Sequence, residues 1–218
     1  MMQIEQARDN MLKQQIRAGG VLKEEVLAII AKTPREYFVP VAFSNLAYAE
    51  INIPLAHSQV MLTPHEEAHM LEALAIHKQE RILEIGTGSG YFTALLAQLG
   101  QQVDSMEIFP DMLDQAKAKL AQLNLDNIHL FTGNGAQDCQ VKQPYDVIAI
   151  TGSLPFLPEC YRQTLSIGGR LFAFLGTGLT MEATLITRHK TDVWSTEMRF
   201  ETYLPPLLNA IHPSSFQF

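Results

Sequence analysis

Three alternating glycines could bring backbone amides against a bound nucleotide. The segment 81–91 reads R-I-L-E-I-G-T-G-S-G-Y, in which an apolar run leads into Gly86, Gly88 and Gly90 and then into a helix-like stretch. Glycine suits such a turn because, without a Cβ, the chain can reverse sharply and a ligand can approach the backbone closely. The segment therefore predicts a strand, a cofactor-binding turn and a helix in succession.

The spacing of these glycines selects among nucleotide cofactors. A dinucleotide-binding turn has the pattern G-x-G-x-x-G, and its third glycine would fall at the bulky Tyr91. The pattern here is G-x-G-x-G preceded by Glu84, which resembles the turn of S-adenosylmethionine-dependent methyltransferases. Glu107 ends the next apolar run, where a carboxylate can bind both hydroxyls of a ribose. These features favour a cofactor site over a Gly-rich loop that only turns the chain.

A second motif could bind zinc. Residues 65–69 read H-E-E-A-H, which satisfies H-E-x-x-H and places His65 and His69 on one face of an expected helix. The motif fixes only three positions, and no G-x-x-H follows at the spacing of metzincins. We therefore favour coincidence on an amphipathic helix and predict no metal.

Composition limits the class of protein. A chain of 218 residues with 47% hydrophobic residues is long enough for one α/β core, so we expect one domain over 1–218. A formal net charge of -7 opposes the basic surface that nucleic-acid binding requires. No apolar stretch approaches the ~20 residues needed to cross a bilayer. Neither nucleic acid nor a membrane is an expected partner.

The cysteines and the first residues indicate a compartment. Cys139 and Cys160 lack C-x-x-C spacing, which favours free thiols in a reducing environment. The first ten residues mix charges where a secretory segment would be apolar. We expect a cytoplasmic protein.

The first third of the chain predicts helices followed by an irregular stretch. Apolar residues at helical spacing cover 4–16 and 21–31, which form an expected N-terminal helical lobe. Segment 35–62 is irregular, and its length favours a functional lid. Thr63-Pro64-His65-Glu66 then reads as a capping box that begins a helix running to about residue 76.

From residue 81 the chain alternates between strands and helices. The expected strands are 81–85, 102–107, 128–132, 145–151 and 169–175, and the expected helices are 91–99, 110–123 and 158–166. Alternating βα units predict an α/β fold with a doubly wound, mostly parallel sheet. Gly168-Gly169 is expected to turn into the fifth strand, and 184–204 to form a hairpin at the sheet edge. Ligands of such sheets bind beyond the carboxyl ends of the strands.

Motifs along nearly the whole chain resemble the protein-L-isoaspartate O-methyltransferase family. They are P-R-E-Y-F-V-P at 34–40, A-Y-A-E-x-x-I-P-L at 47–55, L-E-I-G-T-G-S-G-Y at 83–91, D-V-I at 146–148, G-G-R-L at 168–171 and Y-L-P-P at 203–206. The resemblance implies a Rossmann-like class I methyltransferase, with 1–62 as helical lobe and lid and 63–218 as cofactor-binding core. It also implies S-adenosyl-L-methionine as cofactor, S-adenosyl-L-homocysteine as product, and methylation of isoaspartyl carboxylates in damaged proteins, a repair reaction.

The resemblance assigns the cofactor contacts. It implies that Glu107 binds the ribose and that the G-N-G turn at 133–135 contacts the adenine. Further contacts are implied for His65, which fits the family's Pro-His start of the helix, and for the residues around the glycine turn. The full set is Glu84, Gly86, Gly88, Ser89, Gly90, Glu107, Asn134, Gly135 and His65.

Two motifs depart from the family. Where its members have Gly-Asp-Gly this chain has Asn134, whose amide oxygen can still accept a hydrogen bond from adenine, so we expect weaker recognition. Where they have G-Q-T-I-S, residues 58–62 read S-Q-V-M-L, so Val60 and Leu62 replace two hydroxyls of the reaction site. Thr63 is the nearest remaining hydroxyl and the candidate catalytic residue, although a role as helix N-cap is favoured.

The lost hydroxyls leave three functions open. The first is methylation of isoaspartyl carboxylates by a monomer or weak homodimer, which needs no general base because the acceptor is already ionised. The second is methylation of another acceptor, a small metabolite or a nucleic acid. For that second function an amino-group acceptor is disfavoured, because the loop after Thr151 reads G-S-L-P-F and lacks the D-P-P-Y or N-P-P-Y/F of amino-directed enzymes. The third is a cofactor-binding protein that has lost turnover.

Overall fold

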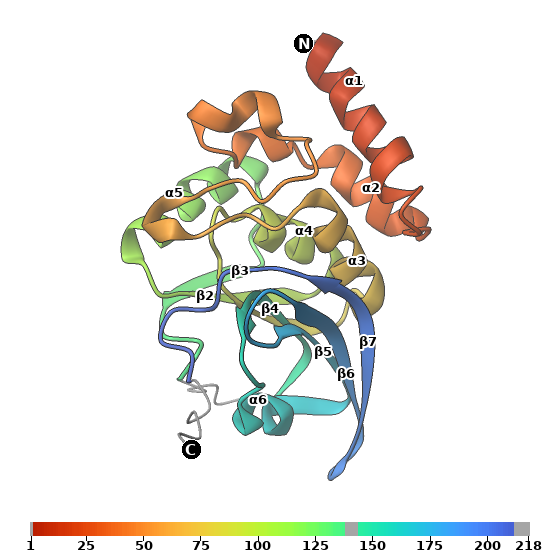
Figure 1. The fold of residues 1–218 in the computed structure, drawn as a ribbon, viewed down its shortest axis with the longest axis vertical. Coiled ribbons are helices and arrows are strands. Elements are labelled where there is room, and N and C mark those ends of the chain that lie inside the picture. Colours follow the sequence, from red (N-terminus) through yellow and green to blue (C-terminus); the bar gives the residue numbers. More distant parts are fainter. Residues whose placement is uncertain (1, 138–143, 212–218) are drawn as a thin grey trace.

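One seven-stranded sheet organises the protein. A computed structural model describes residues 2–137 and 144–211. The strand order is β3-β2-β1-β4-β5-β6-β7; the first five pair in parallel, and β6 and β7 are antiparallel (Figure 1). The strands are β1 (Arg81–Ile85), β2 (Gln102–Glu107), β3 (Ile128–Thr132), β4 (Tyr145–Leu154), β5 (Leu165–Leu175), β6 (Met181–Lys190) and β7 (Val193–Thr202). The predicted mostly parallel sheet and edge hairpin are confirmed.

Apolar side chains cover both faces of this sheet. Along β1 the buried Ile82 and Leu83 belong to different clusters, because successive strand residues point to opposite faces. On one face lie α3 (Pro64–Leu74), α4 (Tyr91–Leu99) and α5 (Pro110–Leu120), and on the other lies α6 (Glu159–Thr164) (Figure 1). A sheet buried on both faces is what continuous apolar strands predict.

The predicted N-terminal helical lobe is present, with a change inside its first helix. α1 (Met2–Asn10) continues into a π-helix at Met11–Ile16, and α2 (Glu24–Lys32) follows. The wider π-turn places residues five apart on one side. Met11 and Ile16 are five apart, and both are fully buried. Burial of both side chains accounts for the departure from a regular helix over 4–16.

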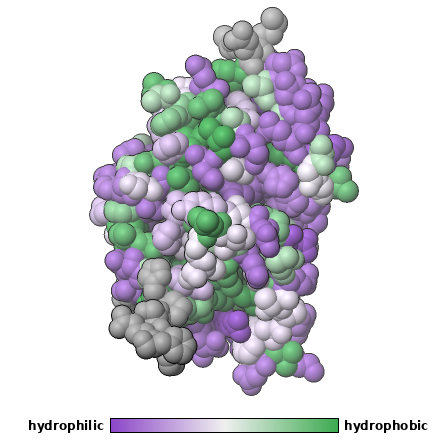
Figure 2. Space-filling view, in the orientation of Figure 1, coloured by the Kyte–Doolittle hydropathy of each residue, from purple (hydrophilic) through white to green (hydrophobic). Residues whose placement is uncertain are grey.

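Segment 35–62 contains short 3-10 turns and no longer element. The turns are Arg35–Tyr37, Val41–Leu46 and Ala56–Ser58. The Lys119 ammonium at the end of α5 donates to the Phe38 carbonyl oxygen over 2.8 Å, which ties the segment to the sheet-covering helices. Figure 2 shows apolar side chains on the surface in this part of the molecule, and the exposed ones include Val41, Leu46 and Ile51.

The capping box that begins α3 is confirmed. The Thr63 hydroxyl oxygen accepts from the Glu66 amide over 3.2 Å, and the Glu66 carboxylate accepts from the Thr63 amide over 2.8 Å. The helix ends at Leu74, just before Ala75, which has a left-handed backbone. The backbone amides of Thr63 and Glu66 are therefore each satisfied by a side chain three residues away.

The fifth strand differs from its prediction. β5 begins at Leu165 and not at residue 169, so Gly168 and Gly169 lie inside the strand. The register with β4 shifts at this point, and Gly168 takes a positive φ of 85°. A bulge of this kind lets a strand continue through glycines that would otherwise form a turn.

The free thiol predicted for Cys160 is wrong, because this cysteine is disulfide-bonded. Sequence spacing carries no information on which sulfurs meet after folding. Cys139 lies outside the described residues. Within the described ranges, no helix has the length and apolar character to cross a membrane. The division into a lobe over 1–62 and a core over 63–218 stays a prediction.

Candidate cofactor and acceptor pocket

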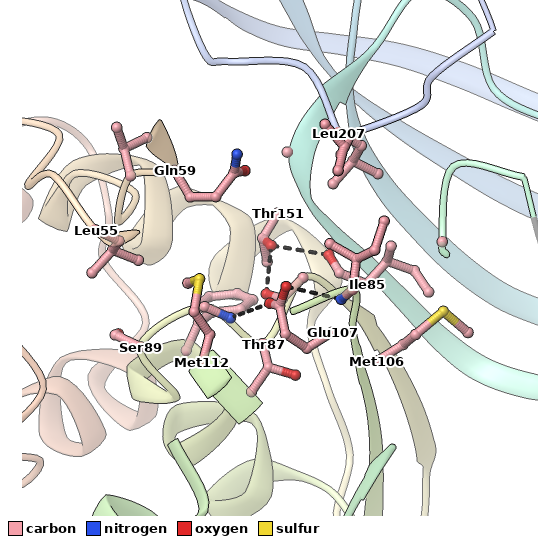
Figure 3. Close-up of a pocket in the computed structure, with 18 of the residues that line it drawn as sticks. Leu55, Gln59, Ile85, Thr87, Ser89, Met106, Glu107, Met112, Thr151 and Leu207 are labelled. Carbon is pink, nitrogen blue, oxygen red and sulfur yellow. Dashed lines mark hydrogen bonds between the residues drawn. The ribbon is translucent and has the colours of Figure 1, made fainter. Parts of the chain in front are cut away.

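A pocket lies at the carboxyl ends of β1 to β4, beneath the end of the 35–62 segment (Figure 3). It is lined by residues 55, 59–62, 67, 85–89, 92, 106–108, 112, 133–136, 151–152 and 207–208. These residues come mainly from the ends of β1 and β2, from the loops after β1, β2 and β3, from the last part of β4, from the end of the 35–62 segment with the start of α3, and from the C-terminal loop. The pocket is therefore the place where the predicted site residues can be tested for position.

The glycine turn is fixed by β4. Gly86 and Gly88 have φ values of 96° and 54°, which glycine adopts at little cost. The Thr151 hydroxyl donates to the carbonyl oxygens of Ile85 and Gly86, at 2.9 and 2.8 Å. A Cβ built on Gly86 would lie 2.4 Å from the same hydroxyl oxygen. Only glycine fits there, and Thr151 holds the turn in place.

The last two residues of the glycine motif have different surroundings. Ser89 lines the pocket, whereas Gly90 does not and instead begins α4 with a φ of 85°. A Cβ on Gly90 would lie 3.1 Å from the Cβ of Ala116 in α5. Gly90 thus allows α4 and α5 to pack closely behind the turn.

Glu107 is held at the end of β2 by backbone amides. Its Oε2 accepts from the Gly88 amide over 2.9 Å, and its Oε1 accepts from the amides of Ile108 and Phe109 over 2.9 and 3.1 Å. Hydrogen bonds to a carboxylate are stronger than neutral ones, so three of them fix its orientation. A carboxylate has about four acceptor sites, so the three amides leave about one for a ribose hydroxyl.

The G-N-G turn after β3 is closed by its own side chain. The Asn134 amide oxygen accepts from the Ala136 amide over 3.2 Å, and its Nδ2 donates to Gln137 over 3.3 Å. The Tyr161 hydroxyl donates to the Gly135 carbonyl oxygen over 2.5 Å. Asn134 lines the pocket, and its amide oxygen is engaged by the turn. Weaker recognition of adenine stays a prediction.

Glu84 lies behind the turn and does not line the pocket. It is fully buried, and its Oε2 accepts from the hydroxyls of Thr93 and Ser105, both over 2.5 Å. Burial raises the pKa of Glu84 to about 8, because water no longer stabilises the charged form. Glu84 thus lies beneath the glycine turn, where it joins Thr93 of α4 to Ser105 of β2.

The lid segment closes the pocket on the other side. Val60 and Leu62 line it with apolar side chains. Gln59 extends an amide toward it (Figure 3). His57 stacks on Phe109 with ring centroids 4.0 Å apart, and its Nε2 lies 3.0 Å from both Asp111 carboxylate oxygens. These contacts anchor the lid to the start of α5.

Thr63 and His65 lie outside this lining. Thr63 caps α3 as described above. The His65 ring packs on His69, with centroids 4.2 Å apart, and on Phe200 of β7. His69 bonds the Gly19 carbonyl oxygen over 3.1 Å, and burial lowers its pKa. The histidines therefore join α3 to the N-terminal lobe and to the sheet edge.

The glutamate of the H-E-x-x-H motif has structural partners. Glu66 Oε1 accepts from the Thr202 hydroxyl over 2.6 Å, and its Oε2 accepts from Asn52 over 3.1 Å as well as from the helix cap. Across residues 2–137 and 144–211, no three His, Cys, Asp or Glu side chains gather as a metal site. The motif residues serve helix capping and packing.

Three pocket features had no signal in the sequence. Glu67 lines the pocket with its carboxylate paired to the buried Arg35. Thr151 locks the glycine turn, as described above. Leu207 packs against Gly152, where a Cβ would lie 2.6 Å from a Leu207 methyl carbon, and it borders the pocket in Figure 3. Their partners stand 32 to 66 residues away in sequence, so only folding brings them together.

Comparison with known proteins identifies the family. The family model described as "Protein-L-isoaspartate(D-aspartate) O-methyltransferase (PCMT)" matches residues 6–208. The chain belongs to this family. A protein-L-isoaspartate O-methyltransferase of Methanoculleus marisnigri is 41% identical over 78% of this chain and 77% of its own length. A second, from Rhodopseudomonas palustris, is 36% identical over 92% of this chain and 82% of its own length.

Solved structures show the same fold. A Plasmodium falciparum chain bearing the family name, solved in complex with S-adenosyl-L-homocysteine, superposes with a TM-score of 0.79 at 19% identity. It covers 92% of this chain, and 97% of its own length is matched. The predicted Rossmann-like class I methyltransferase fold is confirmed.

Proposed function

We propose that this chain is an S-adenosylmethionine-dependent O-methyltransferase that methylates isoaspartyl carboxylates in damaged proteins. The observation that supports this best is the family match over residues 6–208 together with a pocket at the strand ends that holds the family's cofactor motifs. Of the contacts predicted from sequence, Gly86, Gly88, Ser89, Glu107, Asn134 and Gly135 line that pocket.

The residues present suit this cofactor. Along the sheet edge, the G-N-G turn after β3 is proposed to contact adenine, Glu107 after β2 the ribose, and the glycine turn after β1 the amino-acid tail. At Gly135 a Cβ would lie 2.2 Å from Ile85 Cγ2, so the loop after β3 packs tightly on the end of β1 and its backbone faces the pocket. When bound, the cofactor supplies a methyl group activated by a sulfonium.

The chain's own residues then position the acceptor and exclude water. An isoaspartyl carboxylate is ionised at neutral pH and can attack in line without a general base. Val60 and Leu62 offer it an apolar wall, and Gln59 offers an amide donor. Losing a hydroxyl donor costs about 1–3 kcal/mol of polar support, which slows the reaction without abolishing it. The roles predicted for Thr63, His65, Glu84 and Gly90 stay predictions.

The test is methyl transfer to paired peptides. We expect label from methyl-labelled S-adenosylmethionine to enter an isoaspartyl peptide as a base-labile ester, and not the matched aspartyl peptide. Absence of label in both peptides at high enzyme concentration would contradict the proposal.

A second candidate is a member of the family with another small acceptor or without turnover. It is favoured by one observation, the apolar pair Val60 and Leu62 in the pocket wall. Calorimetry together with transfer assays separates the candidates. Cofactor binding without transfer to any acceptor supports loss of turnover, and transfer to a small acceptor but not to the isoaspartyl peptide supports the other acceptor.

We also propose that the protein is a monomer or weak homodimer that binds neither nucleic acid nor membranes. The net charge of -7 supports this. A cytoplasmic location stays a prediction, and the disulfide at Cys160 removes the argument from free thiols. Size-exclusion chromatography with light scattering tests the oligomeric state.

A further inference from the structure

Glu67 is a pocket residue that neither the sequence motifs nor the proposed function explains. It stands in the first turn of α3, is 3% exposed and lines the pocket. Arg35 donates to its Oε2 from a fully buried guanidinium that also donates to the Leu62 carbonyl oxygen over 2.6 Å. Within the described part of the chain, Glu67 Oε1 accepts no hydrogen bond. One carboxylate oxygen therefore stays available to a ligand.

The place of Glu67 relative to the sheet indicates which part of the cofactor it meets. The strand order places β3 and β2 on one side of β1, and β4 and β5 on the other. Adenine and ribose are proposed to lie at the β3 and β2 ends, near Asn134 and Glu107. α3 packs on β5, so Glu67 approaches from the opposite side. The part of the cofactor left for that side is its amino-acid tail.

The charges around the glycine turn favour a cation there. Glu67, Glu84 and Glu107 are all buried around this turn, and Glu67 and Glu107 each act electrostatically on Glu84. Arg35 is the cation that pairs with Glu67. A buried carboxylate with a free oxygen gains from a second hydrogen-bonding cation, because desolvation otherwise opposes its charge.

We propose that Glu67 binds the ammonium group of the cofactor's amino-acid tail through Oε1, while Arg35 holds Oε2 and fixes the carboxylate's direction. This inference rests on the proposed function, since it assumes an S-adenosylmethionine site. It assigns to a residue of α3 a direct part in cofactor recognition.

Proton release on ligand binding is a second, independent measure of this contact. Burial raises the pKa of Glu67 to about 7, while Arg35 lowers it. The groups acting on Glu67 from the surrounding elements are Arg35, Glu66, Glu50, Tyr91 and Glu84. An ammonium stabilises the ionised carboxylate, so binding lowers this pKa and releases protons near neutral pH. Affinity for the amine ligands should therefore rise with pH through about 7.

The experiment is calorimetry with three ligands and two variants. S-adenosylhomocysteine carries ammonium and carboxylate, its decarboxylated analogue carries only the amine, and methylthioadenosine carries neither. Glu67→Gln keeps the side-chain volume and an acceptor for Arg35 but removes the charge. We expect it to weaken both amine ligands about 10- to 100-fold and to leave methylthioadenosine unchanged. Glu72→Gln is the control, because Glu72 lies on the same helix outside the pocket lining.

Several outcomes overturn the proposal. One is an unchanged affinity of Glu67→Gln for S-adenosylhomocysteine. Another is an equal loss of affinity for methylthioadenosine, which would indicate that Glu67 has a structural role. If Glu67→Gln does not fold, the wild-type protein still decides. It must bind the decarboxylated analogue more tightly than methylthioadenosine. It must also release protons on binding the decarboxylated analogue and not on binding methylthioadenosine, as measured by calorimetry in buffers of different ionisation enthalpy.

Binding of the three ligands by the wild-type protein distinguishes an error in the role of Glu67 from an error in the cofactor assignment. A wild-type protein that binds none of the three ligands contradicts the cofactor assignment itself. A wild-type protein that binds all three equally keeps the cofactor site and removes Glu67 from it.

Discussion

The two sides of the pocket differ in the groups that they present. On the β1–β3 side lie the glycine turn with Gly86 and Gly88, and Glu107, which three backbone amides hold. On the lid side lie the apolar Val60 and Leu62 and the acidic Glu67. The backbone at the strand ends shapes much of the first side, whereas side chains set the character of the second.

The two sides also differ in what stabilises them. On the cofactor side, hydrogen bonds hold the glycine turn: the Thr151 hydroxyl bonds carbonyl oxygens 65 and 66 residues away, and the Glu107 carboxylate accepts from Gly88, 19 residues away. The lid side depends on the buried Arg35–Glu67 pair, which joins segments 32 residues apart. Removing one partner of a buried pair costs about 3–5 kcal/mol, so the lid is the side more sensitive to single charge changes.

The largest effect is expected from Gly86→Ala on the cofactor side. The new Cβ would meet the Thr151 hydroxyl at 2.4 Å, at a φ of 96°. Strain and overpacking together should lower the free energy of unfolding by about 2–5 kcal/mol and abolish cofactor binding. Denaturant unfolding and calorimetry measure both.

Gly20→Ala is the matched control for this prediction. Gly20 has a φ of 101°, but no atom of the described residues lies within 4 Å of its Cβ position, so the backbone strain alone remains. Its cost should be about 1–2 kcal/mol. Equal costs for the two variants would show that the contact with Thr151 does not fix the turn.

Glu107→Gln should come next. The substitution keeps one oxygen acceptor and removes the charge, so S-adenosylhomocysteine affinity should fall about 10- to 100-fold by calorimetry. Asp114→Asn, an exposed acid on α5, is the control and should bind as the wild type does. An unaltered affinity in Glu107→Gln would contradict ribose binding by this residue.

Restoring hydroxyls on the lid side should have a smaller effect, of the opposite sign. Val60→Thr combined with Leu62→Ser adds two donors to the pocket wall and should raise kcat/KM for an isoaspartyl peptide about tenfold. Val41→Thr, at a residue 92% exposed, is the control. No gain would favour an acceptor other than an isoaspartyl carboxylate.

The smallest effect is expected from Thr63→Ala. As an N-cap its loss should lower the free energy of unfolding by about 1 kcal/mol, with methyl transfer unchanged after correction for folded protein. Thr63→Ser should restore stability. A large fall in kcat in the folded Ala variant would instead support the catalytic role.

Much of the fold could be predicted because its signals are local. The strands 81–85, 102–107 and 128–132 and the helix 91–99 have the bounds that periodicity gave them. The capping box at Thr63 follows from four adjacent residues. The bulge at Gly168 escaped prediction because glycines in a turn and glycines in a bulged strand look alike in sequence.

What the sequence alone determined is the cofactor half of the pocket, since a glycine turn and an acid at a strand end are separated by fixed strand and helix lengths. Only the tertiary structure decided that Glu84 lies behind the turn while Glu67 faces the pocket, and that Cys160 forms a disulfide. Contacts such as Arg35 with Glu67 depend on how helices and lid pack over the sheet. Side-chain direction at those contacts is set by burial and pairing across distant segments, which no local pattern encodes.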